Sequence, residues 1–402
     1  MALIVQKFGG SSVADAAKVR RVAGIIADTY CEGHDVVVVL SAQGDTTDEL
    51  IEKALEINPK PSKRELDMLL STGEQVSIAL CAMALEKLGL PVISLTGWQV
   101  GIKTNSNYGN ARIKSVATER IRRELDQRKI VLVAGFQGIN KYDDITTLGR
   151  GGSDTTAVAL AAALHADLCQ IYTDVEGVYT ADPRIIPTAI KLDEITFDEM
   201  LELASLGAQV LHNRSVELAK RYGANLEVLS SYVRKPGTKV KEVTNMEDTK
   251  ISGVAKDSNI ARIALKGLKD EPGTAFRIFR VLAKNNINVD IILQSAGSDD
   301  TKEISFTVAK GDMEAAVQAL NENKAALGFK ELDVSDKFCK VSIVGAGMIK
   351  SPGIAAQMFE ALYEANVNIH MISTSEIKIS VLIDVEHAEA AMQSIHKKFF
   401  GV

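Results

Sequence analysis

The chain of 402 residues is long enough for two or three domains, each with its own hydrophobic core. Hydrophobic residues make up 46% and charged residues 24%, which is typical of a soluble α/β protein and excludes a disordered or fibrous one. The net charge of −6 and the lack of a lysine- or arginine-rich run argue against nucleic acid or an anionic membrane as the main partner, which leaves small molecules.

The beginning of the chain and its cysteines predict a cytoplasmic protein. The apolar run at residues 2–5 is too short for a signal peptide, and no apolar run approaches the roughly 18 residues of a membrane span. The four cysteines lie far apart without a CxxC pair, so they support neither a zinc site nor disulfide bonds. We therefore expect no protein-bound structural metal.

Short β-branched segments alternate with helical patterns through the first half of the chain. The expected strands are residues 3–8, 36–40, 92–95, 130–134 and 168–172. This alternation predicts an α/β domain with a mostly parallel sheet covered by helices. Ligands bind beyond the carboxyl ends of such strands, so the residues that follow each strand are candidates for the site.

The first expected strand runs into KFGGSS at residues 7–12. Two glycines before a helix can expose N–H groups to a phosphate, and Lys7 can neutralise charge on a transferring phosphoryl group. An ordinary strand-to-helix turn with a surface lysine explains the same residues equally well. This segment alone therefore only suggests a phosphate site.

A second glycine-rich loop, GRGGSDTT at residues 149–156, precedes an alanine-rich stretch that favours a helix. Ser153 or Asp154 could simply cap that helix. Capping does not explain three glycines around Arg150, whose guanidinium could hold a carboxylate through two hydrogen bonds. We favour a binding role for this loop.

Three further loops carry hydroxyl and acidic groups. The segment TDVEGVYTADPR at residues 173–184 could hold a nucleotide and its metal, although a polar turn at Asp182 and Pro183 is the alternative. The loops SAQGDTT at residues 41–47 and STGE at residues 71–74 include Glu74, either a helix cap or a ligand for a substrate ammonium. A P-loop and the protein-kinase signatures are missing from the sequence.

The rest of the chain contains an internal repeat. Residues 232–250 are charged, contain proline and glycine, and predict a linker with a boundary near Met246. Beyond it, residues 272–295 align with residues 352–375 after a shift of 80, and both copies place apolar residues on one helical face. Each copy is expected to form a ferredoxin-like βαββαβ unit, with or without a ligand.

These motifs, taken in order, closely resemble those of the aspartokinases, which belong to the amino acid kinase family. The resemblance implies an α/β, three-layer αβα sandwich at residues 1–245, followed by two ACT domains at residues 252–335 and 336–402. It implies transfer of phosphate from ATP, with Mg²⁺, to the side-chain carboxylate of L-aspartate. Such an enzyme acts at the first step of lysine, threonine and methionine synthesis, and lysine and/or threonine would inhibit it.

The resemblance also assigns residues by position. Catalytic roles fall on Lys7, which would stabilise the phosphoryl group, and on Asp154, which would orient the cationic residues. Nucleotide contacts fall on Lys7, Gly9, Gly10, Ser11, Thr173, Asp174, Tyr179 and Arg184. Aspartate contacts fall on Ser41, Thr47, Glu74, Arg150 and Ser153. Effector contacts fall on Asp270, Gly273, Ala275, Asn288, Asp290, Gln294, Asn368 and Ile369.

The implied chemistry is physically consistent, because a carboxylate is already a nucleophile and needs positioning and charge neutralisation rather than a general base. The Pro-Gly turn of the repeat would receive an effector carboxylate, and Asp290 its ammonium. One departure is Gln209, which stands where aspartokinases usually have a lysine. A kinase of glutamate and an amino-acid sensor with an inactive kinase domain are the alternatives. Paired ACT domains imply a homodimer or larger homo-oligomer.

Overall fold

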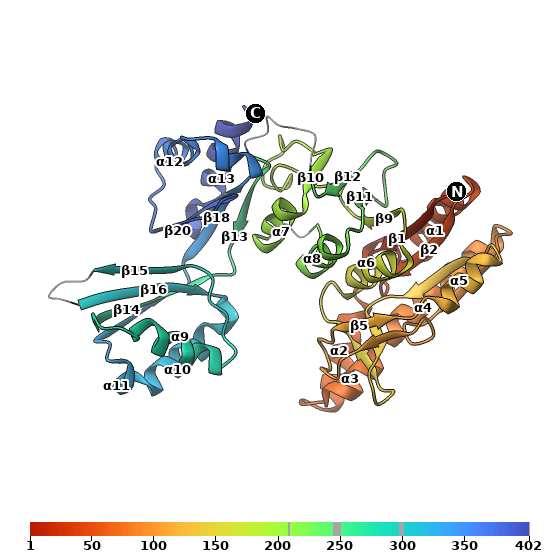
Figure 1. The fold of residues 1–402 in the computed structure, drawn as a ribbon, viewed down its shortest axis with the longest axis horizontal. Helices are drawn as coiled ribbons and strands as arrows, with labels where there is room; N and C mark the ends of the chain where they lie inside the picture. The colour runs from red at the N-terminus through yellow and green to blue at the C-terminus, as the bar shows by residue number, and fades with distance from the viewer. Residues whose placement is uncertain (208–209, 244–250, 297–300, 402) are drawn as a thin grey trace. The chain divides into compact units, whose positions relative to one another are not determined.

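The computed structural model describes residues 1–207, 210–243, 251–296 and 301–401, drawn as a coloured ribbon in Figure 1. Gln209 and the expected boundary at Met246 lie outside these described residues. The chain divides into two compact units. The first holds residues 1–179, 190–205 and 210–243, and the second holds residues 180–189, 206–207 and the described residues from 251 onward.

The first unit is built on an eight-stranded sheet with the order β10-β12-β11-β9-β1-β2-β6-β3. Its strands are β1 (Leu3–Phe8), β2 (Asp35–Leu40), β3 (Val92–Leu95), β6 (Ile130–Ala134), β9 (Leu168–Thr173), β10 (Glu194–Thr196), β11 (Leu226–Ser230) and β12 (Thr238–Lys241). All neighbours run parallel except β11 and β12. The five strands expected from the sequence are confirmed to within one residue.

Helices cover both faces of this sheet. On one face, α1 (Ala16–Cys31) and α4 (Thr72–Lys87) share an apolar core with β2 and β6. On the other, α6 (Gly152–Leu164) packs on β1, β2 and β9 and against α8 (Asn213–Tyr222). The other helices of this unit are α2 (Thr46–Ile57), α3 (Lys63–Leu70), α5 (Glu119–Asp126) and α7 (Phe197–Ser205). The unit is the expected three-layer sandwich.

The helical stretch from Lys63 to Lys87, which spans α3 and α4, is long and apolar enough to cross a membrane by length and composition alone. A core helix of a soluble protein passes the same test. Here 44% of the tested window is buried, and α4 packs on α1, β3 and β6. The buried face of α4 is therefore explained by its place beside the sheet, whereas Val76, Leu80 and Met83 on the same helix are exposed.

A second, smaller sheet of the first unit has the order β5-β4-β7-β8 and was not expected from the sequence. Its strands are β4 (Ile102–Thr104), β5 (Ile113–Val116), β7 (Gln137–Ile139) and β8 (Ile145–Thr147). Three or four residues are too few to show a period of two, so the sequence pattern gives little signal for them. This sheet leads directly into the loop at residues 149–151.

Part of the expected linker at residues 232–250 is a strand, which corrects that prediction. β12 pairs with β11 in antiparallel and with β10 in parallel orientation. Thr238 and Val240 are fully buried while Lys239 is exposed, an alternation hidden in sequence by the neighbouring charges. The sheet of the first unit thus continues to at least residue 241.

The second unit contains two four-stranded sheets, with the orders β15-β16-β14-β17 and β13-β18-β20-β19. The first sheet holds β14 (Ala261–Lys269), β15 (Ile292–Ala296), β16 (Thr301–Val308) and β17 (Glu331–Ser335), with α9 (Thr274–Lys284), α10 (Met313–Glu322) and α11 (Lys324–Leu327). The second holds β13 (Gly253–Asp257), β18 (Phe338–Val344), β19 (Met371–Thr374) and β20 (Lys378–Asp384), with α12 (Ile354–Glu364) and α13 (Ala388–Phe400).

One strand in the sheet of the second copy, β13, comes from the part of the chain that precedes the first copy. β13 pairs with β18 along residues 253–257, on the side of β18 opposite β20. All seven residues of β18 are buried, so its edge needs a partner strand. The first βαββαβ unit is consequently inserted between β13 and β18 of the second.

The two copies otherwise match closely, as the repeat predicts. Gly273 and Gly353 precede α9 and α12 with φ of 91° and 95°, and Asn286 and Asn366 follow the same helices with φ of 57° and 54°. The predicted helix faces are buried: Ile278, Leu282, Met358 and Leu362 all lie in the apolar cores. The repeat is therefore structural as well as sequential.

Residues 180–189 belong to the core of the second unit although they continue the loop that follows β9. Ala181 and Ile186 are buried in the apolar core beneath α12 and α13. The Val254 N–H donates to the carbonyl of Thr180 at 2.7 Å, and the Thr180 hydroxyl lies 2.8 Å from His396 Nε2 of α13. The TDVEGVYTADPR motif is therefore divided between the two units.

Candidate functional site

The candidate site lies where several parallel strands end together. Phe8 of β1 is level with Leu40 of β2 and with Tyr172 of β9 in the sheet register. The segments that follow these strands therefore start at one edge, and each carries residues expected to bind substrate. The aromatic rings of Phe8 and Tyr172 stack with centroids 4.5 Å apart beneath that edge.

An ion pair joins the ends of β1 and α6. Lys7 Nζ lies 2.6 Å from Asp154 Oδ1, and both side chains are nearly buried, at 13% and 12% exposure. Asp154 stands in the first turn of α6, where the helix dipole stabilises negative charge. The lysine is thus fixed at the sheet edge beside a helix N-terminus, as a phosphate site requires.

Gly135 allows this helix N-terminus to approach the sheet. It follows β6, and a Cβ atom built on it would lie 2.7 Å from Ser153 Oγ and 2.9 Å from Val39 Cγ1. Any side chain here would push α6 away from β2 and displace the Lys7 partner. The sequence analysis missed Gly135, although a glycine directly after the strand at residues 130–134 was a visible signal.

The loops after β1 and β2 are held together at Gly10. A Cβ atom on Gly10 would lie 2.6 Å from the carbonyl oxygen of Ala42, and the Gly44 N–H donates to the Gly10 carbonyl at 3.0 Å. The Ser11 carbonyl accepts from the Tyr232 hydroxyl at 3.1 Å. Gly9, by contrast, has an ordinary extended φ of −73°. Close packing therefore explains Gly10 more directly than Gly9.

Glu74 is a buried carboxylate with one free oxygen. It stands in the first turn of α4 at 3% exposure, and Oε1 accepts from the Ala42 N–H at 3.2 Å. Oε2 has no hydrogen-bond partner among the described residues. Burial raises the pKa of Glu74 to about 7. An unpartnered buried acid is costly unless a ligand supplies the missing donor, as an ammonium group would.

Ser41 and Thr47 stand near the two ends of the β2–α2 connection, which also contains Ala42, the hydrogen-bond partner of Glu74. Ser41 directly follows β2, and its N–H donates to the Phe8 carbonyl at 3.2 Å. Thr47 stands in the first turn of α2 and is half-buried. The structure therefore places Ser41 at the sheet edge, and the role of both residues in binding aspartate stays a prediction.

Arg150 is exposed, and no described residue forms an ion pair with it. Its neighbours Gly149 and Gly151 have φ of 77° and 67°, which explains the glycines on both sides. Gly151 is also packed against His212, because a Cβ atom there would lie 2.2 Å from the ring. The guanidinium is thus available to an anionic ligand.

The residues expected to contact the nucleotide divide between the units. In the first unit, the Thr173 hydroxyl donates to Asp174 Oδ1 at 3.1 Å, and Tyr179 forms a backbone bridge with Lys191. Burial, with help from Glu176, raises the pKa of Tyr179. In the second unit, Arg184 forms an ion pair with Asp182 at 2.7 Å. The role of these residues in nucleotide binding stays a prediction.

No group of three His, Cys, Asp or Glu side chains among residues 1–207, 210–243, 251–296 and 301–401 could hold a metal ion. Mg²⁺ in phosphotransferases is usually held by one or two carboxylates together with substrate phosphates. The exposed Asp174 at the end of β9 fits that requirement, whereas Asp154 is already paired with Lys7.

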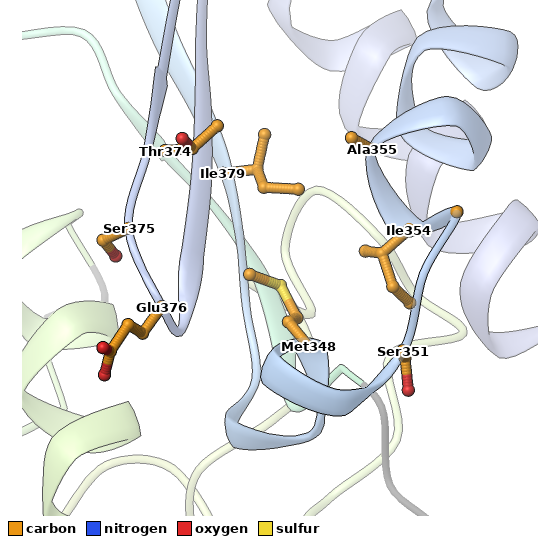
Figure 2. Close-up of a pocket in the computed structure, with 9 residues that line it drawn as sticks. Met348, Ser351, Ile354, Ala355, Thr374, Ser375, Glu376 and Ile379 are labelled. Carbon is orange, nitrogen blue, oxygen red and sulfur yellow. The ribbon is translucent and has the colours of Figure 1, made fainter.

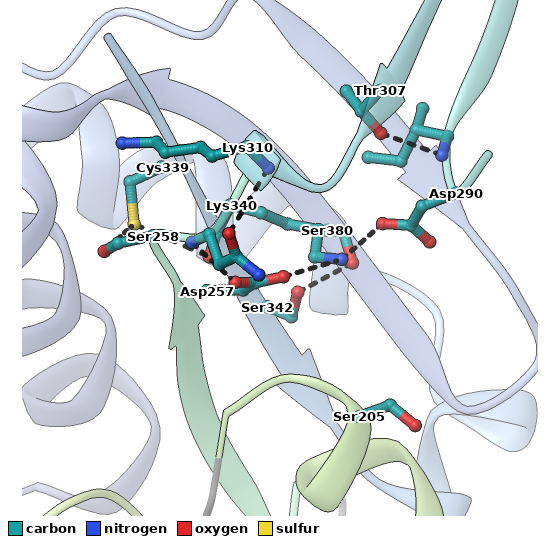
Figure 3. Close-up of polar contacts among 12 residues, drawn as sticks. Ser205, Asp257, Ser258, Asp290, Thr307, Lys310, Cys339, Lys340, Ser342 and Ser380 are labelled. Atoms are coloured by element: carbon teal, nitrogen blue, oxygen red, sulfur yellow. Dashed lines mark hydrogen bonds and ion pairs between the residues drawn. The ribbon is translucent and has the colours of Figure 1, made fainter. Parts of the chain in front are cut away.

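Asp290, expected to hold an effector ammonium, is paired with a lysine of the other repeat (Figure 3). Lys340 of β18 is 5% exposed, and its Nζ contacts Asp290 and lies 3.6 Å from Asp257 of β13. Asp270 is likewise paired, with Lys302 at 2.5 Å. An effector ammonium at Asp290 would therefore have to compete with Lys340 or share the carboxylate with it.

The other expected effector residues surround the repeat turns. Gly273 and Ala275 lie at the start of α9, Asn288 and Gln294 are exposed near β15, and Asn368 and Ile369 precede β19. A pocket of about 390 Å³ opens at the corresponding turn of the second copy (Figure 2). It is lined by Met348, Ser351, Gly353, Ile354, Ala355, Thr374, Ser375, Glu376 and Ile379.

The sequence did not point to the residues whose side chains bind the backbone of the site loops. Arg214 and Asp67 bind backbone groups around the Arg150 loop, and Ser231 donates to the Thr173 carbonyl at 3.2 Å. Such residues belong to no spaced motif, because their partners are backbone atoms distant in sequence. Only the fold brings them together.

Comparison with known proteins agrees with the described units. The model of the amino acid kinase family matches residues 2–230, and the model of the ACT domain matches residues 263–323 and 341–399. The aspartokinase of Bacillus sp. (strain MGA3) is 51% identical over 400 residues, which cover 99% of this chain and 97% of that protein.

Solved structures give the same match. The structure of E. coli aspartokinase III in complex with aspartate and ADP, in the R-state, aligns with a TM-score of 0.82 and 28% identity, covering 99% of this chain and 100% of that one. The T-state structure of that enzyme, in complex with lysine and aspartate, aligns with a TM-score of 0.76 and 28% identity, covering 99% of each chain.

Proposed function

The chain belongs to the aspartokinase family, whose members are kinases, and we propose that it transfers the γ-phosphate of ATP to the side-chain carboxylate of L-aspartate. The product is 4-phospho-L-aspartate, and the reaction is the first step of lysine, threonine and methionine biosynthesis. The residues expected from the sequence to bind aspartate and ATP are proposed for those roles here.

One observation supports this proposal most directly: Lys7 of β1 is paired with Asp154 at the start of α6, next to Arg150 in the chain, while Glu74 contacts the segment after β2. Glu74 offers a free buried oxygen to an ammonium group, Arg150 offers an unpaired guanidinium to a carboxylate, and Lys7 stands at the phosphate position. An α-amino acid with a second carboxylate has the matching groups. The relative solved with aspartate and ADP bound supports the same choice.

The proposed mechanism is direct displacement at phosphorus. A side-chain carboxylate oxygen of aspartate attacks the γ-phosphorus as the bond to the β–γ bridging oxygen of ATP breaks, and ADP leaves. Lys7 neutralises charge on the transferring group, while Asp154 holds the ammonium in place. The N–H groups near Gly10 and at the start of α6 add positive potential. No group of the protein needs to remove a proton.

Mg²⁺ is proposed as the accompanying cofactor, held by the nucleotide phosphates and Asp174. When bound, it supplies charge neutralisation on the phosphates. Asp174 in turn is oriented by the Thr173 hydroxyl. Replacing Asp174 by asparagine should therefore raise the Mg²⁺ concentration needed for half-maximal activity.

The decisive experiment traps the product. Purified protein is incubated with ATP, Mg²⁺, L-aspartate and hydroxylamine, which converts an acyl phosphate into a hydroxamate. We expect hydroxamate from the wild type and almost none from Lys7→Ala. Hydroxamate from glutamate but not from aspartate would change the substrate, and hydroxamate from neither would favour the amino-acid sensor.

We further propose that lysine and/or threonine inhibit the enzyme through the ACT pair. The family-model match to both repeats and the relative solved with lysine support this regulation. The pocket in the second copy and the Asp290–Lys340 pair are the places where an amino acid would act. Activity that stays constant across millimolar lysine and threonine, singly and together, would contradict the proposal.

A homo-oligomer formed through the ACT units is also proposed, in a cytoplasmic enzyme. β15 is an edge strand of its sheet, and Ile292 and Leu293 on it are 51% and 37% exposed. An exposed apolar edge strand is a site for pairing with another chain. Light scattering should show a mass of at least two chains for the wild type and a smaller mass for Leu293→Glu.

A further inference from the structure

We propose that Arg214 and Asp67 are positioning residues that hold the Arg150 loop in the shape that receives the carboxylate of the amino-acid substrate. The inference rests on the proposed function of Arg150, and it adds two residues that touch neither substrate. Both act at the start of one loop, defined here as residues 148–151: Arg214 binds the Leu148 carbonyl, and Asp67 binds Thr147, which directly precedes the loop.

Arg214 binds the start of the loop from α8. Its Nη1 donates to the Leu148 carbonyl at 2.9 Å, and its Nη2 donates to the Ala111 carbonyl at 2.7 Å. The side chain is half-buried, and burial lowers the pKa of the guanidinium without making it neutral at physiological pH. A single planar cation thus ties two separate segments together through charge-assisted hydrogen bonds.

Asp67 of α3 binds the same two segments as Arg214. It is 1% exposed, and its oxygens accept from the Gly109 N–H at 3.0 and 2.9 Å. They also accept from the Thr147 N–H at 2.9 Å and from the Thr147 hydroxyl at 2.7 Å. Burial raises the pKa of Asp67, and these hydrogen bonds oppose that rise.

The two segments also contact each other. The Ala111 N–H donates to the Thr147 carbonyl at 2.8 Å, and the Leu148 N–H donates to the Phe136 carbonyl at 2.8 Å. A Cβ atom on Gly149 would lie 3.2 Å from Asn110 Oδ1. Residues 147 and 148 are therefore held by hydrogen bonds to the Asp67 carboxylate, to the Arg214 guanidinium and to backbone groups.

The far end of the loop is fixed by the residue that caps α8. The ring of His212 packs directly against Gly151, and its Nδ1 accepts from the Arg214 N–H at 3.3 Å. The first turn of α8 therefore holds the loop at both ends. Between these ends, Arg150 is exposed and unpaired with any described residue.

The contacts of Arg214, Asp67 and His212 with the loop have a consequence for substrate binding. Gly149 and Gly151 give the loop the left-handed turns it needs, but glycines also leave it many other conformations. Fixing the loop beforehand removes that ordering cost from substrate binding and aims the guanidinium. A residue with a merely structural role would affect stability without favouring one substrate over the other.

The test separates aspartate binding from ATP binding. For Arg214→Met we expect the KM for aspartate to rise about tenfold or more, while the KM for ATP changes less than about twofold. Arg214→Lys, which can serve one carbonyl at a time, should fall between methionine and wild type. Asp67→Asn, which keeps one acceptor oxygen, should also raise the KM for aspartate selectively.

Arg122→Met is the matched control. Arg122 donates through Nη2 to the Leu164 carbonyl at 3.1 Å, the same kind of bond at the opposite end of α6. We expect both KM values to stay at the wild-type level in this variant. Equal rises in the two KM values, or no rise, in Arg214→Met and Asp67→Asn would overturn the inference, even if the variants melt earlier.

Failure of the proposed function would look different. If the wild type formed no hydroxamate from aspartate and bound no aspartate in calorimetry, the proposed substrate would fall and this inference with it. If the wild type turned over aspartate but Arg214→Lys and Asp67→Asn showed no selective change, only the inference would fall. The two conservative variants keep the test decisive should Arg214→Met not fold.

Discussion

The role proposed for Glu74 depends on pH, because only the ionised carboxylate attracts an ammonium group. Burial raises its pKa to about 7, so below that pH much of the ligand-free enzyme carries a neutral Glu74. We predict that the KM for aspartate rises about tenfold for each pH unit below 7 and levels off above it. Initial rates at saturating ATP from pH 6 to pH 8.5 measure this.

Glu74→Gln supplies the control, because an amide does not titrate. Its KM for aspartate should be high and nearly independent of pH over the same range. The stability of the ligand-free protein should move in the opposite direction from affinity. The folded pKa lies above the ordinary value of 4.5, so stability falls as pH rises from about 4.5 to 7. A wild-type KM that is flat across pH 7 would contradict this account.

Lys340 offers a second prediction about a single residue. Lys340→Met leaves Asp257 and Asp290 facing each other without their cation. We expect the second unit to lose about 1–2 kcal/mol, less than for a fully buried pair because Asp290 is half exposed. The half-inhibitory concentration of the effector should fall several-fold, because Asp290 no longer has a competing partner.

The control for Lys340 is Lys266→Met, which breaks an exposed pair with Glu331 on the first ACT sheet. It should leave both the stability and the inhibition close to those of the wild type, because an exposed ion pair contributes little. Calorimetry and inhibition curves measure both quantities. An unchanged or higher half-inhibitory concentration in Lys340→Met would argue that Asp290 does not receive the effector.

Among secondary-structure elements, those with long buried runs were predictable and short ones were not. β2 and β6 are buried at nearly every residue, so their valine-rich sequences indicated strands directly. β4, β7 and β8 have three residues each, too few to show a pattern. β13 has an ordinary strand sequence, but nothing local indicates that its partner is β18 rather than a strand of the nearer repeat.

The site shows the same limit. Lys7, Glu74, Arg150 and Asp154 lie in compact motifs, so a family resemblance could assign them roles, which stay predictions, and the structure pairs Lys7 with Asp154. Their supports are solitary residues whose partners are backbone groups far along the chain. The meeting of Arg214 with the Leu148 carbonyl depends on tertiary structure alone.

β13 yields a prediction at the scale of an element. Val254 is 2% exposed, pairs with Ile343 and packs in the core of the second ACT unit. Val254→Asp should lower the stability of the second unit by about 3 kcal/mol or more, since it buries an unpaired charge. Val243→Asp, at a position 75% exposed, should cost about 0.5 kcal/mol or less. Equal costs measured by calorimetry would contradict the pairing.

At the scale of the whole molecule, two compact units with separate cores should melt separately. Calorimetry should resolve two transitions, because cooperative unfolding follows domains rather than chains. ATP with aspartate should raise one transition, and an inhibitory amino acid the other. Val254→Asp should lower the melting temperature of the transition that belongs to the second unit. A single transition shifted equally by every ligand would show that the units unfold together.

The strands of the first ACT sheet lie in the chain between two strands of the second, and this order limits how the chain can evolve by recombination. Because β13 precedes the first sheet and completes the second, no single cut between the repeats yields two whole modules. A deletion or exchange ending at residue 336 would leave β18 with a bare edge. An exchange that keeps both sheets complete must therefore include the two ACT units together, with β13.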